Sequence, residues 1–331
     1  MSIDIHAHII PPAFISSLKE GDYGVEIAID NGTVHASLAG GETIGVLRAE
    51  LSDMEARLAA MDGSGVDIQV LAGWIDLNGY TLEHAQGASY SRLFNESLAD
   101  VAAAHPDRFL ALANVPLQTP AAAAAELIHA VQELGMVGAQ IATTVAGGEL
   151  DDPGLDPFWE AAEALGAILV LHPFNPLPQR GLKRYFLSNA VGRPAETTIA
   201  LGHLIFGGVF ERFPNLTVCV VHGGGFLPYQ IGRMDRAFHA KPELAAVNIT
   251  RPPSAWLDHL YYDTVTHNPD VARFLVDQVG ATRVVLGTDY PFEMGDANPV
   301  ETVQAIPGLA EDDRLLILEG NVRRLVDNVQ R

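Results

Sequence analysis

The chain has 331 residues, 48% of them hydrophobic, which is enough for one large domain or two average ones. Its 41 acidic residues outnumber 20 basic ones, and the net charge of -21 would repel phosphate backbones and anionic lipids. We therefore expect neither a nucleic-acid nor a membrane partner. The single cysteine, Cys219, excludes an intramolecular disulfide, and the chain opens on an apolar strand rather than a secretory leader. Both features favour a cytoplasmic protein.

The first predicted element is an apolar strand over residues 2–10, which carries His6 and His8. Side chains alternate along a strand, so the two imidazoles share a face and lie about 7 Å apart at Cα. Neutral imidazoles in this arrangement can bind one divalent metal ion. Alternatively, they are polar caps on a buried strand. The choice depends on whether other strands supply further ligands.

Two local patterns follow the opening strand. Short alternating stretches over residues 25–38 surround Asn31-Gly32 and predict a β-hairpin, which we expect as a small insertion (residues 23–39) near the mouth of a barrel. Residues 52–55, Ser-Asp-Met-Glu, have the pattern of a capping box and predict the start of a helix.

From residue 66 onward, short apolar runs alternate with helical stretches. The runs that predict strands cover residues 66–71, 109–115, 137–142, 167–171, 216–221, 260–263 and 283–286. The stretches that predict helices cover residues 82–104, 121–134, 157–165, 195–206, 227–238 and 269–279. Together with the opening strand, these runs make eight strands that are apolar throughout, as in a parallel sheet covered on both faces.

Eight such strands predict a (β/α)8 TIM-type barrel, formed by residues 1–331 as a single domain. The rival architecture is a doubly wound open sheet. That fold would favour a Gly-x-Gly-x-x-Gly fingerprint after the first strand, and the sequence has none there. The barrel is therefore the better prediction.

Polar residues stand where several predicted strands end, which is where barrels of this kind place their functional groups. They are His6, His8, His172, His222 and Asp289. One such residue could be a core polar group bonded to the backbone, but five would each need their own partners. Three imidazoles and one carboxylate suit a single divalent metal ion that activates a water molecule. Zinc is expected first, and manganese suits the same donors.

The residues bear on the number of metal ions and on the identity of the catalytic base. A second ion would need a bridging group such as a carbamylated lysine on the fourth strand, but Lys19, Lys183 and Lys241 all lie elsewhere. We therefore expect one ion and no organic cofactor. Spacing does not decide which histidine is the base. His222 opens a glycine-rich turn and is the candidate for proton transfer, with a role as a further metal ligand as the alternative.

Several stretches match a known family, and they run nearly from end to end of the chain. They cover residues 4–11 (DIHAHIIP), 191–198 (VGRPAETT), 207–214 (GGVFERFP), 222–225 (HGGG), 232–233 (GR) and 287–292 (GTDYPF). The chain resembles the amidohydrolase superfamily and, within it, the aminocarboxymuconate-semialdehyde decarboxylase group of non-oxidative decarboxylases. The His-x-His element is shared across the superfamily, whereas PAETT and GTDYPF are specific to this group.

The resemblance implies roles for the strand-end residues. A metal ion would be held by His6, His8, His172 and Asp289. His222 would activate the metal's water and move protons, with Asp289 beside it as the second catalytic residue.

The resemblance also implies substrate-binding residues. Arg48 would clamp an anionic substrate, although it could instead be an ordinary surface arginine, and Phe292 would lie in the same pocket. Arg233 matches an arginine that reaches across a homodimer into the neighbouring pocket. The family's second cross-dimer arginine is replaced by Lys241, and an aromatic lining position falls near Asn189. Residues 175–186 also depart from the family, so the substrate is left open.

We therefore expect a metal-dependent decarboxylase that acts on an unsaturated or aromatic carboxylic acid without an organic cofactor. Two alternatives stay open. One is a metal-dependent hydrolase or hydratase on the same barrel, since both chemistries need an activated water and a base. The other is a barrel that binds a metal or ligand without catalysis.

Overall fold

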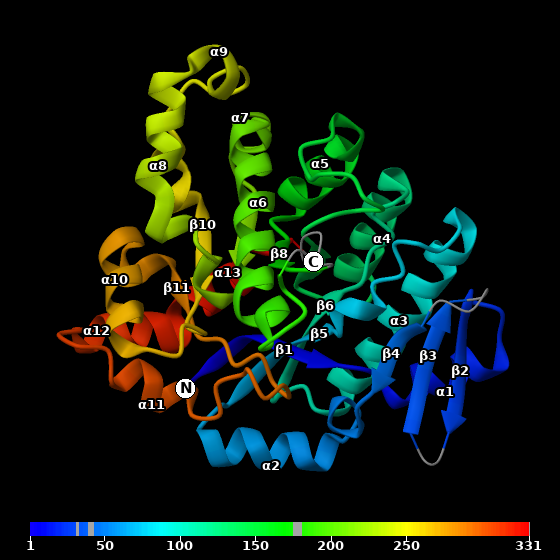
Figure 1. Cartoon of the computed structure of the whole chain (residues 1–331). Coiled ribbons are helices and arrows are strands. Elements are labelled where there is room, and N and C mark those ends of the chain that lie inside the picture. Colours follow the sequence, from blue (N-terminus) through cyan, green and yellow to red (C-terminus); the bar gives the residue numbers. More distant parts are fainter. Residues whose placement is uncertain (31–32, 39–42, 175–180, 331) are drawn as a thin grey trace.

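The computed structural model describes residues 1–30, 33–38, 43–174 and 181–330, and a parallel eight-stranded sheet lies at its centre (Figure 1). The sheet is ordered β1-β5-β6-β7-β8-β9-β10-β11. Its strands are β1 (Ile3–Ile9), β5 (Ile68–Gly73), β6 (Phe109–Ala113), β7 (Gly138–Ala142), β8 (Ile168–His172), β9 (Thr217–Val220), β10 (Leu260–Asp263) and β11 (Val284–Val285). All eight predicted strands are present, so the predicted (β/α)8 barrel is confirmed.

Backbone hydrogen bonds join the two ends of the sheet. The amide of Ile5 on β1 donates to the carbonyl of Leu286, 2.9 Å away, just beyond β11. The amide of Asp289 donates to the carbonyl of His6 over 2.8 Å, and the amide of His8 donates to the carbonyl of Tyr290 over 2.8 Å. This seam holds the loop after β11 against the carboxyl end of β1.

Helices surround the strands (Figure 1). They are α1 (Pro12–Glu20), α2 (Met54–Ser64), α3 (His84–Ala104), α4 (Pro120–Gln132), α5 (Asp156–Leu165), α6 (Arg193–Phe206), α7 (Val209–Arg212), α8 (Leu227–Ala240), α9 (Pro242–Ala245), α10 (Pro269–Val279), α11 (Pro299–Gln304), α12 (Glu311–Leu315) and α13 (Asn321–Asn328). Helices α8 and α9 extend away from the barrel. None of the helices within the described ranges has both the length and the apolar character needed to span a bilayer.

Local sequence explains how an outer helix packs. At the start of α10, the Asn268 side chain accepts hydrogen bonds from the amides of the first turn. Ala272, Leu275 and Val276 then recur at spacings of three and four and are buried against the barrel. Strands β1, β7 and β8 are buried at every residue, as expected for a parallel sheet covered on both faces.

The insertion after β1 is larger than predicted. Strands β2 (Val25–Asp30) and β3 (Thr33–Leu38) form the predicted antiparallel pair, and β4 (Thr43–Leu47) adds a third strand beside β3. The insertion therefore extends to residue 47 rather than 39. Strand β4 is short and contains Gly45, which weakens a strand pattern. The expected Asn31-Gly32 turn lies outside the described residues.

The predicted capping box at residues 52–55 is wrong by one residue. Helix α2 begins at Met54, and its N-cap is Asp53, whose carboxylate accepts a hydrogen bond from the amide of Ala56 over 2.9 Å. The hydroxyl of Ser52 instead donates to the carbonyl of Ile10 over 2.8 Å. Ser52 thus ties the helix start to the chain just beyond β1.

Candidate metal centre and active site

The predicted strand-end residues converge at the carboxyl end of the barrel. Donor atoms of His6, His172, His222 and Asp289 all lie within 4.8 Å of one another. The Nε2 atom of His8 lies 3.2 Å from His6 Nε2 and 3.2 Å from Asp289 Oδ1. The structure therefore brings together all five residues that the sequence singled out, although they come from four different strands or the loops that follow them.

The loops that carry His222 and Asp289 have unusual backbones. His222 has φ of 55° and Asp289 has φ of 58°, in the left-handed region that non-glycine residues rarely adopt. A Cβ on Gly225, in the turn after His222, would lie 2.3 Å from the Pro194 carbonyl oxygen. Only glycine allows this approach, and it packs the turn closely against the start of α6. Backbone strain such as that at His222 and Asp289 is typical of functional sites.

Three of the imidazoles are held with the same ring atom toward the cluster. His6 Nδ1 is 2.7 Å from a carboxylate oxygen of Asp263. His8 Nδ1 is 3.2 Å from the Gly73 carbonyl oxygen, and His172 Nδ1 is 3.0 Å from the Pro173 carbonyl oxygen. Each acceptor calls for a proton on Nδ1, which leaves the Nε2 lone pair directed at the cluster.

This donor set fits a divalent metal ion. The Nε2 atoms of His6 and His8 face each other at 3.2 Å, and two bare acceptors at that distance need a cation between or beside them. His172 Nε2 and Asp289 Oδ1 are buried without a hydrogen-bond partner. Imidazole nitrogens and a carboxylate oxygen are the ligands that zinc and related ions bind. The fit therefore rests on the orphaned atoms as well as on residue type.

Burial and the neighbouring groups shift the pKa values of the residues in the cluster. Burial lowers the pKa of His8, and burial together with the neighbouring imidazoles lowers the pKa of His172 well below its ordinary value. Burial opposes the charge on His6, but Asp289 and Asp263 outweigh it and raise the pKa of His6 to about 10. The same partnership overcomes burial at Asp289 and holds its pKa well below the usual range. His6 and Asp289 thus each favour the charged form of the other.

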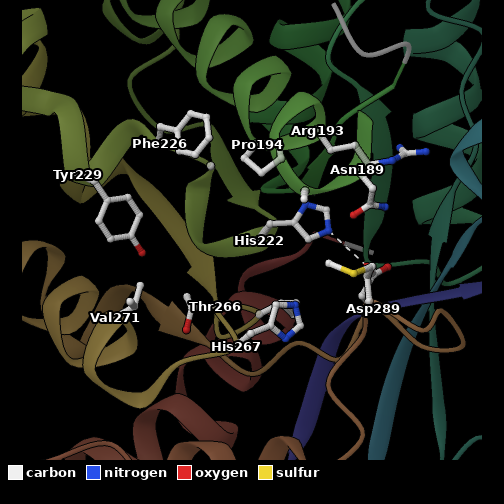
Figure 2. Close-up of a pocket in the computed structure, with 14 residues that line it drawn as sticks. Asn189, Arg193, Pro194, His222, Phe226, Tyr229, Thr266, His267, Val271 and Asp289 are labelled. Carbon is white, nitrogen blue, oxygen red and sulfur yellow. Dashed lines mark hydrogen bonds and ion pairs between the residues drawn. The ribbon is translucent and has the colours of Figure 1, made fainter. Parts of the chain in front are cut away.

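His222 differs from the other imidazoles. Its Nε2 atom is 3.4 Å from Asp289 Oδ2, but its Nδ1 atom is buried without a hydrogen-bond partner. Its side chain is 17% exposed, whereas the side chains of His6 and His8 are at most 1% exposed. Figure 2 shows His222 between Asp289 on one side and Tyr229 and Val271 on the other. Within the described residues, its ring is therefore held only through Nε2, whereas His6, His8 and His172 are held through Nδ1.

A buried hydrogen-bond network ties β1 to the loop after β11. The Arg57 side chain on α2 is fully buried and donates to the carbonyl of His8 and to Gln69 Oε1, the latter over 3.1 Å. Gln69 Nε2 donates to Asp4 over 3.0 Å, and the Thr288 hydroxyl donates to the same Asp4 oxygen over 2.6 Å. These bonds fix the backbone on both sides of the metal-ligand candidates.

A cavity of about 250 Å³, here called the polar cavity, opens onto the cluster at His172, His222 and Asp289. Arg48 and Phe292 line it, and the Arg48 guanidinium lies 5.8 Å from the centre of the Phe292 ring. Both residues therefore lie in the cavity that adjoins the cluster. The charge of Arg48 is shared, because Glu293 pairs with it at 2.8 Å.

Sequence reasoning missed two residues of the site. Arg193, at the start of α6, lines the polar cavity, donates to the Pro173 carbonyl over 2.8 Å and lies 3.9 Å from Asp76. It belongs to the 191–198 stretch that carried the resemblance, where it received no role. Asp263 ends β10 and orients His6; its position as a polar residue at a strand end was the signal that could have found it.

Two predicted substrate-binding residues are not brought to the site of their own chain. Arg233 and Lys241 are exposed, on α8 and immediately after it, and Lys241 pairs with Glu243 at 3.8 Å. Neither belongs to the described lining of the cavities that open at His222. Asn189, expected where the family has an aromatic residue, lines the polar cavity.

Comparisons with known proteins agree with this geometry. A family model described as Amidohydrolase matches residues 3–327. The 2-amino-3-carboxymuconate-6-semialdehyde decarboxylase of Dictyostelium discoideum is 34% identical, over 97% of this chain and 90% of its own length. The gamma-resorcylate decarboxylase of a Rhizobium species is 32% identical, over 83% and 87%.

A solved structure extends the likeness to three dimensions. The crystal structure of a 2,6-dihydroxybenzoate decarboxylase from Rhizobium superposes with a TM-score of 0.81 at 27% identity and covers 98% of both chains. The matches span the barrel and the strand-end cluster alike. The chain therefore belongs to the amidohydrolase family and, within it, to the group of aminocarboxymuconate-semialdehyde decarboxylases and their relatives.

Proposed function

We propose that this protein removes CO2 from an unsaturated or aromatic carboxylic acid with the help of a divalent metal ion. It is a carboxy-lyase, as its relatives are. The observation that carries the proposal is the convergence of three Nε2 lone pairs and the Asp289 carboxylate at the floor of a cavity that two arginines line. Such a cavity can hold an anion beside a metal ion.

His6, His8, His172 and Asp289 would hold one ion, for which zinc is our first choice and manganese the alternative. A bound ion would polarise a substrate oxygen and lower the pKa of a water molecule. No organic cofactor is needed for this chemistry. The single-ion assignment is supported by the positions of the three lysines, none of which lies on the fourth barrel strand.

His222 would move the proton that the reaction consumes. The carbon that bears the carboxylate takes a proton, its bond to the carboxylate breaks, and the electron pair of that bond restores the unsaturated system as CO2 leaves. His222 Nε2 is 3.4 Å from Asp289 Oδ2, so the two groups can share this proton. The free Nδ1 atom of His222 supports the acid–base role over a role as a fixed ligand.

The polar cavity would orient the substrate. Arg48 and Arg193 supply positive charge for its anionic group, and the ring of Phe292 packs against it. Arg233 and Lys241 would act on the pocket of a partner chain, in a cytoplasmic homodimer whose subunits are single domains of residues 1–331. The exposure of Arg233 on α8, which extends away from the barrel, supports this arrangement (Figure 1).

The shared site can be tested by mixing inactive chains. A hybrid dimer of Arg233→Ala and His222→Ala chains contains one intact site, so we expect part of the activity to return. No recovery in a sample that is shown to exchange subunits would contradict the shared site.

The reaction is tested by product analysis in deuterated water. Muconate semialdehyde-type and hydroxybenzoate-type acids are offered, and CO2 and product mass are followed. We expect CO2 and a product with one carbon-bound deuterium in place of the carboxyl group. A hydrolase or hydratase would instead retain every carbon and add the mass of water, and that result would overturn the decarboxylase assignment.

A further inference from the structure

A second cavity, of about 350 Å³, adjoins the polar cavity, and we call it the apolar chamber. Pro194 at the start of α6, Phe226 and Tyr229 around the start of α8, Val265 after β10, and Val271 on α10 form its walls. Figure 2 shows Pro194, Phe226, Tyr229 and Val271 on the side of His222 that faces away from Asp289. Carbon atoms of four different elements thus enclose a space next to the candidate catalytic histidine.

The two cavities meet at the reacting groups. Five residues line both of them, and these are Asn189, Arg193, His222, Asp289 and Met294. A ligand held at His222 can therefore extend into both cavities at once. The apolar chamber, at about 350 Å³, is within the range of pockets that bind small organic ligands, and the polar cavity, at about 250 Å³, is slightly below it.

Charge is distributed unevenly between the cavities. Arg48, Asp76 and Glu293 line the polar cavity and do not belong to the described lining of the apolar chamber. Apart from its histidines, the chamber has charged groups only where it meets the polar cavity, at Arg193 and Asp289, among the residues that the structure describes. A charged group is thus better placed in the polar cavity, where Arg48 and Arg193 can bind a carboxylate beside the candidate metal ligands, and an uncharged group is better placed in the chamber.

The chamber also leaves apolar surface in contact with water. Phe226 is 38% exposed and Val271 is 36% exposed. Covering them with an apolar group would be favourable. A small-molecule group is a better occupant than an apolar side chain of a second copy, because the chamber is continuous with His222 and Asp289, where the substrate would react.

We infer that the substrate carries an apolar substituent, an alkyl chain or a second ring, which occupies the apolar chamber while the carboxylate lies in the polar cavity. This inference rests on the proposed decarboxylase function and names its substrate class. On a benzoate ring, the para position is the one farthest from the carboxylate, so with the carboxylate at Arg48 we assign the para substituent to the chamber. The enzyme therefore acts best on hydroxybenzoate-type acids extended at that position.

A homologous series tests the inference. The acids are 2-hydroxybenzoates that carry hydrogen, methyl, ethyl or propyl at position 4, and kcat/KM is measured for CO2 release. Each methylene that leaves water for an apolar site increases kcat/KM about fourfold. A flat or falling series, in a protein that decarboxylates the parent acid, would overturn the chamber's role and leave the proposed function standing.

Filling the chamber is the second arm. Val271→Trp places a large side chain into it from a partly exposed helical position, so the core is undisturbed. We expect the ratio of kcat/KM for the propyl acid to kcat/KM for the parent acid to fall at least tenfold. The value of kcat/KM for the parent acid should change less than twofold. Val247→Trp, at a valine that is 66% exposed and outside both cavities, is the matched control and should change neither. Equal effects of Val271→Trp on both acids would contradict the inference.

Binding separates this inference from the proposed reaction. The probes are 2-nitrophenols with the same alkyl series at position 5, para to the nitro group that replaces the carboxylate. They contain no carboxylate to lose, and their affinities are measured by calorimetry. Affinity that rises about fourfold per methylene, without CO2 release from any acid, supports the chamber and overturns the decarboxylase proposal. The contrary result has two parts: affinity that does not change along the alkyl series, and a changed oligomeric state in Val271→Trp. Together they would show that a second chain fills the chamber, and would overturn the inference.

Discussion

Asp263→Asn should weaken metal binding without touching any candidate ligand atom. One oxygen of Asp263 accepts from the amides of Gly223 and Val265, over 2.8 and 3.1 Å, and the other is 2.7 Å from His6 Nδ1. An asparagine that keeps the two amide bonds must turn its NH2 group toward His6. Two donors then face each other, and the proton of His6 is driven from Nδ1 to Nε2, the atom directed at the cluster.

The size of the effect follows from the burial of this pair. Both side chains are 1% exposed, so water cannot replace the lost acceptor. Removal of a group that orients a metal-bound histidine typically lowers metal affinity about 10- to 100-fold, or about 1.4 to 2.7 kcal/mol. Asparagine nearly matches aspartate in shape, so the packing around β10 is retained.

The assay is a zinc competition titration against a chromogenic chelator, with circular dichroism to verify folding. Asp258→Asn is the matched control, because Asp258 pairs with His259 at 3.0 Å but is 72% exposed and precedes β10, whereas Asp263 ends that strand. We expect its zinc affinity to equal that of the unaltered protein. A zinc affinity for Asp263→Asn within twofold of the control would refute the claim that Asp263 orients His6 for a metal ion.

Three further outcomes are expected. His222→Ala should keep its metal and lose about 10² to 10⁴ in turnover, whereas His172→Ala should lose metal; equal metal loss in both, by elemental analysis, would make His222 a ligand. Zinc affinity should rise up to about tenfold per pH unit between about pH 6.5 and 9, because the proton on His6, whose pKa is raised to about 10, must leave; pH-independent affinity would contradict this. Arg57→Met strands a strand carbonyl and Gln69 Oε1 and should lower the free energy of unfolding by about 2–5 kcal/mol, measured with urea; a loss below about 1 kcal/mol would show that the network is not stabilising.

The barrel could be predicted because its strands are short, apolar and regularly spaced. The strand-end histidines and Asp289 could be predicted for a related reason, since parallel strands bring all their carboxyl ends to one rim. Strand β4 could not be predicted, because Gly45 interrupts a pattern that is only a few residues long. The cap of α2 was misplaced because Ser52 and Asp53 are both good N-cap residues, and a contact with Ile10 decides between them.

The remaining features depend on contacts between distant segments. Arg193 reaches the polar cavity because a π-helical turn, Ser188–Gly192, precedes α6 and sets its first residues beside Pro173. The high pKa of His6 results from the carboxylates of Asp263, at the end of β10, and Asp289, in the loop after β11, and no local pattern reports it. The division of the site into a polar and an apolar cavity likewise involves side chains from α6, α8 and α10, which lie far apart in sequence.

The central claim is that one divalent ion, held by the strand-end cluster, is required for decarboxylation. The most direct test removes the metal with a chelator and then titrates zinc back. During the titration, CO2 release is followed from an acid that the protein decarboxylates. We predict no CO2 release from the metal-free protein, and a return of activity that saturates at about one zinc ion per chain. Full activity in verified metal-free protein, or saturation only at two ions per chain, would contradict the account.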